Sequence, residues 1–311
     1  MLLKHHSKKT AENQSFNGVV KILPLLVFIF FSAFVRADIQ VTDDSGKQHR
    51  FAQPVQRIVA LMPHATELLY AVGAGQQIVG AVDYSDYPPE AKSIPRVGGY
   101  SGLNIEAIVA LQPDLIVAWP EGNNSRELAR LEQLGFDIYA SGPETFEDIA
   151  VNLENLAALT GHEAEGVSAA TDFRNKTRIL RERYSNRHPV TVFYQVWHQP
   201  LLTQNGSTFI SKAIELCGGR NIFADLAIAA PQVSIEAVLA ADPQAIVASG
   251  MGESRPQWLD GWRGYTGLSA VKTDSLYHIH PDLFHRPTPR FLLGTEILCK
   301  DIDRTRALLQ P

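Results

Sequence analysis

The order of hydrophobic and polar residues along the chain predicts an α/β fold. Residues 38–51 alternate between apolar and polar side chains, which predicts a leading hairpin. Further on, short apolar runs at residues 57–61 and 78–82 flank a helical pattern that begins at Pro63 and ends near Gly73. Strands that alternate with helices in this way build a sheet that helices cover on both faces.

An internal repeat divides the chain into two comparable halves. Residues 104–119 align without gaps on residues 234–249, and eight of the sixteen positions are identical. Each copy has the pattern of a capped helix that turns through a proline into a buried strand. Because the copies are offset by 130 residues, the repeat predicts two related, Rossmann-like lobes.

The segment between the two halves predicts one long helix. Residues 163–185 contain no proline and place apolar side chains three or four residues apart. A continuous helix of this length would span roughly 35 Å and would act as a stiff hinge that moves little when a ligand binds. The predicted organisation is an N-terminal lobe with its hairpin at 38–161, a linking backbone helix at 162–187, and a C-terminal lobe at 188–311.

The first 37 residues differ from the rest of the chain. Four lysines precede an apolar run at residues 22–34, and small residues follow up to Ala37. This pattern predicts a signal peptide, residues 1–37, that is cleaved after Ala37. An uncleaved membrane anchor is the alternative, although 13 apolar residues fall short of the roughly 20 that a spanning helix needs.

Charge argues against a nucleic acid or an anionic lipid as the partner. The full chain has 28 basic and 33 acidic residues. Without residues 1–37 it keeps 23 basic and 32 acidic residues, which gives a net charge of −9. Such an acidic surface repels polyanions.

The remaining chain has two cysteines, Cys217 and Cys299. An even number of cysteines in an exported protein predicts a disulfide, because exported proteins reach oxidising compartments. A free thiol pair or a metal site is the alternative, but neither cysteine has a second cysteine or a histidine at ligand spacing.

Five short segments are distinctive: 84–89 (YSDYPP), 97–100 (VGGY), 112–119 (QPDLIVAW), 217–223 (CGGRNIF) and 231–236 (PQVSIE). They resemble segments of periplasmic cobalamin-binding proteins, and the resemblance runs from about Arg57 to the C-terminus. It implies a class III periplasmic binding protein: two Rossmann-like α/β lobes joined by one rigid helix, located in the periplasm, monomeric and without a resident cofactor. The transported ligand would be cobalamin or a related corrinoid.

A corrin is a flat, largely apolar ring fringed with amides, so aromatic walls and a few fixed polar groups suit it. Aromatic residues follow the predicted strands of both lobes, and the resemblance also implies that Asp282 and Arg286 help to hold the corrin. Each aromatic residue could instead be a packed surface residue, and the Asp282–Arg286 pair a local ion pair. The predicted ligand-binding residues are Tyr84, Tyr100, Trp119, Trp197, Asp282, Phe284 and Arg286.

Glu106 and Glu236 occupy the same position in the two copies of the repeat, at the first turn of each predicted helix. A carboxylate is favoured there by the helix dipole, which is sufficient reason for its presence. The resemblance implies a further role: an exposed glutamate on each lobe contacts arginines of the two permease subunits of an ABC importer. A carrier with two related lobes matches a twofold transporter.

The sequence gives weaker support to other functions. The chain has no Gly-x-Ser-x-Gly elbow and no phosphate-binding loop, so we do not expect an enzyme. Haem or ferric-siderophore binding on the same fold is an alternative. A shorter corrinoid is another, because Ala230 stands where a cobalamin binder can have tryptophan. A metal-ion receptor is a further alternative. The residues behind the haem and metal alternatives are His64, Tyr84, His198, His278, His280, Asp282 and His285.

Overall fold

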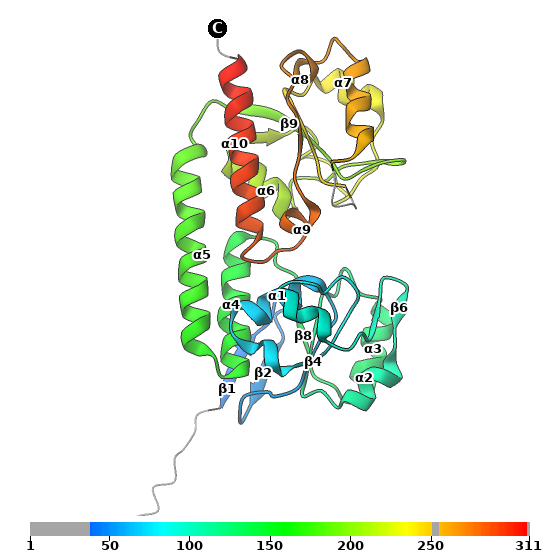
Figure 1. Cartoon of the computed structure of the whole chain (residues 1–311), viewed down its shortest axis with the longest axis vertical. Helices are drawn as coiled ribbons and strands as arrows, with labels where there is room; N and C mark the ends of the chain where they lie inside the picture. The colour runs from blue at the N-terminus through cyan, green and yellow to red at the C-terminus, as the bar shows by residue number, and fades with distance from the viewer. Residues whose placement is uncertain (1–37, 251–254, 310–311) are drawn as a thin grey trace, which may run out of the picture. The chain divides into compact units, whose positions relative to one another are not determined.

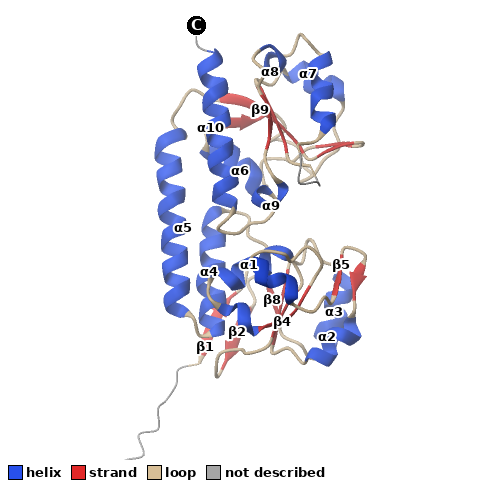
Figure 2. Cartoon of the chain, in the orientation of Figure 1, coloured by secondary structure: helices blue, strands red, loops and turns tan. Residues whose placement is uncertain are grey.

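The computed structural model describes residues 38–250 and 255–309, and these contain two four-stranded parallel sheets with helices around them (Figures 1 and 2). The predicted α/β class with two lobes is therefore confirmed. The predicted signal peptide at residues 1–37 lies outside the described part of the chain. Within that part, no helix has both the length and the apolar character needed to cross a membrane.

The first lobe begins with the predicted hairpin, in which β1 and β2 pair antiparallel. Its sheet has the strand order β4-β3-β7-β8. The elements of this lobe are β1 Ile39–Thr42, β2 Gln48–Phe51, β3 Ile58–Ala60, α1 Pro63–Ala71, η1 Ala74–Gln77, β4 Ile78–Ala81, η2 Pro89–Ser93, β5 Gly98–Gly99, β6 Gly102–Leu103, α2 Ile105–Leu111, β7 Leu115–Ala118, α3 Ser125–Gln133, β8 Ile138–Ala140 and α4 Phe146–Thr160.

The second lobe has the strand order β12-β9-β13-β14, again with parallel pairing throughout. Helix α5 Glu163–Tyr184 precedes it. The elements of this lobe are β9 Val190–Gln195, β10 Trp197–His198, β11 Leu201–Leu202, α6 Phe209–Leu216, β12 Gly219–Asn221, α7 Ile235–Ala241, β13 Ala245–Ala248, η3 Gln257–Gly264, α8 Ser269–Lys272, β14 Leu276–His278, α9 Pro281–Phe284 and α10 Phe291–Leu309.

Helices cover both faces of each sheet because successive strand residues point to opposite sides. In β3, Ile58 packs into the core formed with α1 and α4, whereas Val59 packs against α2 and α3. In β9, Tyr194 packs on the side of α6 and α10, whereas Phe193 packs on the side of α7 and η3. All four side chains are fully buried.

The repeat corresponds to equivalent helix–strand units in the two lobes. One unit is α2 with β7 and the other is α7 with β13, and both strands are central in their sheets. The side chains of Asn104 and Ser234 accept hydrogen bonds from the backbone three residues later and cap the two helices. Both helices end at a left-handed residue, Gln112 with φ 46° and Asp242 with φ 41°. The two copies therefore share cap, turn and strand.

The predicted linking helix is present as α5, which has 22 residues. It packs against α1 and α4 of the first lobe and against α6 and α10 of the second. Gly166 permits a close approach to α4, since a Cβ atom there would lie 2.2 Å from the Cβ of Ala157. The helix is thus held along its length by both lobes. The wider bounds of the linking segment, 162–187, and of the two lobes stay a prediction.

One hydrophobic core extends through both lobes. It contains residues of β3, β7 and β8 together with residues of β9 and β13. At the junction, the ring of Phe146 lies 5.6 Å from that of Phe291 and 6.3 Å from that of Phe173. These rings come from α4, α10 and α5, so the junction joins the two lobes to the linking helix.

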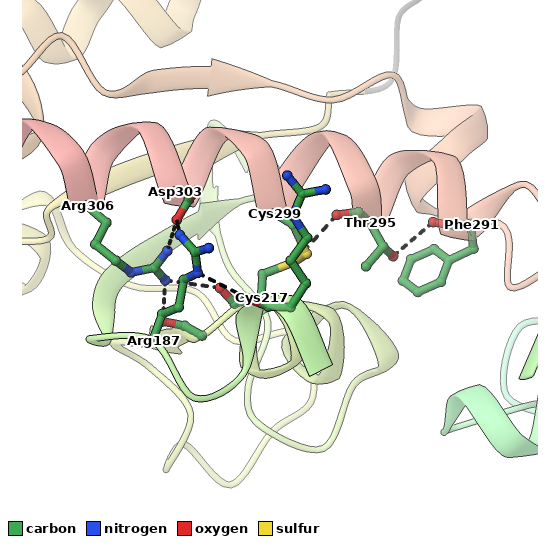
Figure 3. Close-up of a disulfide and its surroundings, with 9 residues drawn as sticks. Arg187, Cys217, Phe291, Thr295, Cys299, Asp303 and Arg306 are labelled. Atoms are coloured by element: carbon green, nitrogen blue, oxygen red, sulfur yellow. Dashed lines mark hydrogen bonds and ion pairs between the residues drawn. A yellow bond between two sulfur atoms is a disulfide. The ribbon is translucent and has the colours of Figure 1, made fainter. Parts of the chain in front are cut away.

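The predicted disulfide joins Cys217, at the end of α6, to Cys299 in α10 (Figure 3). Both cysteines are fully buried, and their Cα atoms are 4.6 Å apart. Arg306 reinforces this connection by donating to the carbonyl of Cys217 at 3.2 Å and to Asp303 at 2.6 Å. The closed loop spans 82 residues, for which the chain-entropy argument gives a stabilisation of about 4 to 5 kcal/mol.

Candidate functional site

Four of the predicted ligand-binding residues lie beyond the carboxyl ends of strands in the two sheets. Tyr84 follows β4, and Trp119 follows β7 directly. Trp197 follows β9, and Asp282 lies in α9, just beyond β14. In open α/β sheets, ligands bind at this edge, because loops there can vary without disturbing the strands.

Trp119 is half-buried and held on several sides. Its backbone N–H donates to Asn123 Oδ1 at 2.9 Å, and the amide of Asn123 donates in turn to the carbonyl of Leu61 at 3.0 Å. The indole meets the ring of His64 edge-on at 6.1 Å. A Cβ atom at Gly122 would lie 2.1 Å from the indole, so glycine is required for the ring to keep this position. Trp119 is therefore a fixed aromatic surface at the end of β7.

Tyr84 and Tyr100 are the two most exposed aromatic residues in the described part of the chain, with relative exposures of 75% and 106%. Tyr84 adopts φ 62°, in the left-handed region, where side chains of this size are rarely found. Tyr100 lies in the turn between β5 and β6. Burying their rings against a flat apolar ligand would remove apolar surface from water.

Trp197 is half-buried and belongs to an aromatic group that sequence reasoning missed. Its indole N–H donates to the carbonyl of Gln199 at 2.9 Å. The neighbouring His198 stacks on Trp258, with the ring centroids 5.5 Å apart. Trp258 lies in η3, 60 residues after His198, so no local pattern could have joined them.

The prediction that Phe284 contacts the ligand is wrong. Its side chain has no exposed surface, since it stacks on Phe291 at 5.4 Å and meets Tyr194 edge-on at 5.8 Å. A side chain enclosed in this way belongs to the hydrophobic core and offers no surface to a ligand. Polar neighbours in the sequence suggested an exposed loop, whereas α9 turns this residue inward.

Arg286 forms more than a local surface ion pair. It forms the ion pair with Asp282 that was the alternative to a ligand role, at 2.7 Å, but it also binds Glu67 of α1 at 2.9 Å and Asp86 at 3.0 Å. Only 11% of its side chain is exposed. Burial raises the pKa of Glu67, against the opposing effect of its hydrogen bond with Arg286. The structure thus brings Asp282 and Arg286 together with two carboxylates of the other lobe.

Three of the histidines proposed as haem or metal ligands have hydrogen-bond partners, whereas His198 Nδ1 and His278 Nε2 are buried without one in the described part of the chain. His64 Nε2 lies 3.0 Å from the carbonyl of Ser141, and burial lowers its pKa to about 4. His280 accepts a hydrogen bond from the backbone of Asp282, and His285 lies 2.8 Å from the hydroxyl of Tyr194. In the residues that the structure describes, no three or more His, Cys, Asp or Glu side chains are grouped to hold a metal ion.

Glu106 and Glu236 are both exposed and both lie in the first turn of their helices, α2 and α7. The backbone N–H of Glu236 and the hydroxyl of Ser234 lower the pKa of the Glu236 carboxyl. Each carboxylate is thus available to a partner on the surface of its lobe.

The two-lobed α/β architecture with strand-end aromatic residues defines a ligand-binding protein, and comparisons specify its family. A family model described as periplasmic binding protein matches residues 58–283. The chain belongs to the periplasmic binding protein family, whose members are binding proteins rather than enzymes.

Similar proteins include a vitamin B12-binding protein of Vibrio cholerae, which is 44% identical over 246 residues, or 79% of this chain and 88% of the relative. A vitamin B12-binding protein of Yersinia pestis is 39% identical over 251 residues, or 81% of this chain and 88% of the relative.

Solved structures give the same fold. The periplasmic vitamin B12 binding protein of Vibrio cholerae superimposes with a TM-score of 0.75 at 42% identity, covering 81% of this chain and 98% of that structure. The periplasmic heme-binding protein BhuT superimposes with a TM-score of 0.71 at 20% identity, covering 82% and 100%. At that identity the likeness extends to the fold alone.

The burial of His64 predicts a loss of stability in acid. Its pKa is about 4 in the folded protein and near the ordinary 6.5 in the unfolded chain. Between these values only the unfolded chain binds the proton, so the free energy of unfolding falls as pH falls, by up to about 3 kcal/mol. Urea unfolding at pH 7 and pH 4.5 measures this difference.

Two matched variants distinguish the contribution of His64 to the pH dependence of stability from the contributions of other titrating groups. His64→Gln keeps an N–H donor but cannot titrate, so its stability should fall less between pH 7 and pH 4.5 than that of the wild type. His188→Gln changes an exposed histidine and should keep the wild-type dependence. Equal pH dependence in all three proteins would contradict the assignment.

Proposed function

We propose that this protein captures cobalamin in the periplasm and delivers it to an ABC importer. The observation that carries the proposal is the 44% identity over 79% of the chain with a protein named for binding vitamin B12. The fixed indole of Trp119 and the exposed rings of Tyr84 and Tyr100 support it, since they offer aromatic surface to a corrin. Trp197, Asp282 and Arg286 provide contacts from the second lobe.

The proposal includes export and a simple stoichiometry. We infer that residues 1–37 form a signal peptide cleaved after Ala37, and amino-terminal sequencing of the exported protein should then begin at Asp38. A sequence that begins at Met1 would contradict cleavage. The protein is proposed to act as a monomer that holds one ligand, without a nucleic-acid partner, in keeping with the net charge of −9 for the exported chain.

Calorimetric titration of residues 38–311 with cyanocobalamin, cobinamide and haemin, each in a separate experiment, tests the ligand. We expect saturable one-to-one binding of cyanocobalamin, and the difference from cobinamide gives the contribution of the nucleotide tail. Trp119→Ala should weaken binding about tenfold or more, because a central aromatic contact is lost. Trp119→Phe keeps an aromatic face, so its affinity for cyanocobalamin should fall less than that of Trp119→Ala. Binding of haemin without binding of either corrinoid would overturn the proposed ligand.

Charge reversal tests the docking of the transporter. Glu106→Arg combined with Glu236→Arg should abolish uptake of cobalamin by cells while leaving its affinity for the purified protein unchanged, because both residues are exposed in the first turns of their helices and neither is a predicted ligand contact. Glu163→Arg combined with Glu165→Arg is the matched control. These residues also lie exposed in the first turn of a helix, so uptake should persist. A fall in affinity in the first double variant would show that the docking assignment is wrong.

A further inference from the structure

A buried carboxylate joins the two lobes beside the predicted ligand-binding residues. Glu67 lies in α1 of the first lobe, and its side chain is only 3% exposed. All three of its polar partners come from the segment that connects α9 to α10 in the second lobe. We call Glu67 and these partners, Arg286, Thr288 and Arg290, the inter-lobe latch.

Every oxygen of Glu67 has a partner in the latch. Oε1 accepts from Arg286 Nη1 at 2.9 Å and from Arg290 Nη1 at 3.0 Å, and Oε2 accepts from the hydroxyl of Thr288 at 3.0 Å. Removing the partners of a buried carboxylate is strongly destabilising, because it leaves an uncompensated charge away from water. Moving the second lobe away would remove all three partners together, so the latch resists separation of α1 from this segment.

The latch also fixes the orientation of Arg286. Its Nη1 atom donates to Glu67 and Asp86, while Nη2 pairs with Asp282 at 2.7 Å. Because a guanidinium is planar and has donors in fixed directions, carboxylates on two edges hold its plane. Asp86 and Asp282 are the more exposed partners, at 41% and 29%, so they are the ones that a ligand can reach. Glu67 holds Arg286 from the buried side.

The same residues hold the loop that carries Tyr84. Arg290 lies over the ring of Tyr87 at 3.7 Å, and Arg286 binds Asp86. Both contacts reach residues within three positions of Tyr84. The latch therefore connects the aromatic loop of the first lobe to Asp282 and Arg286 of the second.

We propose that Glu67 is a positioning residue for the ligand: it holds Arg286 across the lobes, so that affinity depends on Glu67 through Arg286. Glu67 itself touches no ligand. This inference rests on the proposed function, in which Arg286 contacts the corrinoid. It goes beyond that function because it assigns a role to a buried residue of the opposite lobe, 219 positions away in the sequence.

A double-mutant cycle tests whether Glu67 acts through Arg286. Cyanocobalamin is titrated into the wild type, Glu67→Gln, Arg286→Ala and the double variant. We expect Glu67→Gln to weaken binding about tenfold in the wild-type background, which corresponds to about 1.4 kcal/mol. In the Arg286→Ala background the same change should alter affinity less than about twofold. Equal losses in both backgrounds, or no loss in either, would overturn the proposal.

Two further variants control for stability and charge. Glu90→Gln removes an exposed carboxylate of the same lobe outside the latch and should leave affinity unchanged. If Glu67→Gln does not fold, Thr288→Val removes the hydrogen bond to Glu67, together with the one that Thr288 Oγ1 accepts from the backbone N–H of Arg290, without changing any charge. That variant should weaken binding about threefold, and wild-type affinity with Thr288→Val would then contradict the role of the latch.

A ligand-free measurement separates this inference from the proposed function. Spin labels at Lys92→Cys and Lys272→Cys, exposed positions on the two lobes, report the distance between the lobes. Glu67→Gln should broaden this distance distribution, whereas Glu90→Gln should not. An unchanged distance distribution in Glu67→Gln would contradict the claim that Glu67 holds the two lobes together, even if the wild type binds cyanocobalamin. A wild type that binds no corrinoid, but whose distribution broadens in Glu67→Gln, would overturn the proposed ligand and leave the latch as a structural contact.

Discussion

The contact between the rings of Phe146 and Phe291 joins the hydrophobic cores of the two lobes. The two rings stand at the first residues of α4 and α10, so the contact fixes the ends of both helices. Separating the lobes would expose this apolar surface to water, at a free-energy cost of about 25 cal/mol per Å². Since α5 packs on helices of both lobes as well, a continuous packed core sets the spacing of the two sheets.

This constraint keeps the strand ends of the two lobes at a set spacing, which the proposed ligand site requires. A long helix and a shared core allow smaller movements than connections made only of extended strands. The aromatic residues therefore need fixed positions within each lobe, and Trp119 shows how this is achieved: glycine at position 122 leaves room for the indole, and Asn123 ties its backbone to the end of β3. Local packing holds each contact, while the core holds the two sets together.

Features with a local cause could be predicted from the sequence. The absence of proline and the spacing of apolar residues predicted α5, and the repeat predicted two equivalent helix–strand units. The count of cysteines predicted the disulfide. The burial of Phe284 could not be predicted, because it depends on which side of the four-residue helix α9 faces the core. Glu67 was missed for a related reason: a glutamate inside an apolar helix has no local partner, and Arg286 is distant in the sequence.

The electrostatic surroundings of Arg286 favour a neutral ligand over an anionic one. Its charge is already balanced by Glu67, Asp86 and Asp282, and Arg290 shares the carboxylate of Glu67. Three carboxylates and two guanidinium groups leave no excess positive charge to attract an acidic siderophore. Exposed carboxylate oxygens can instead accept hydrogen bonds from amides, which fringe a corrin ring. Arg286, the proposed ligand contact of the second lobe, therefore lies in surroundings that suit an amide-bearing macrocycle.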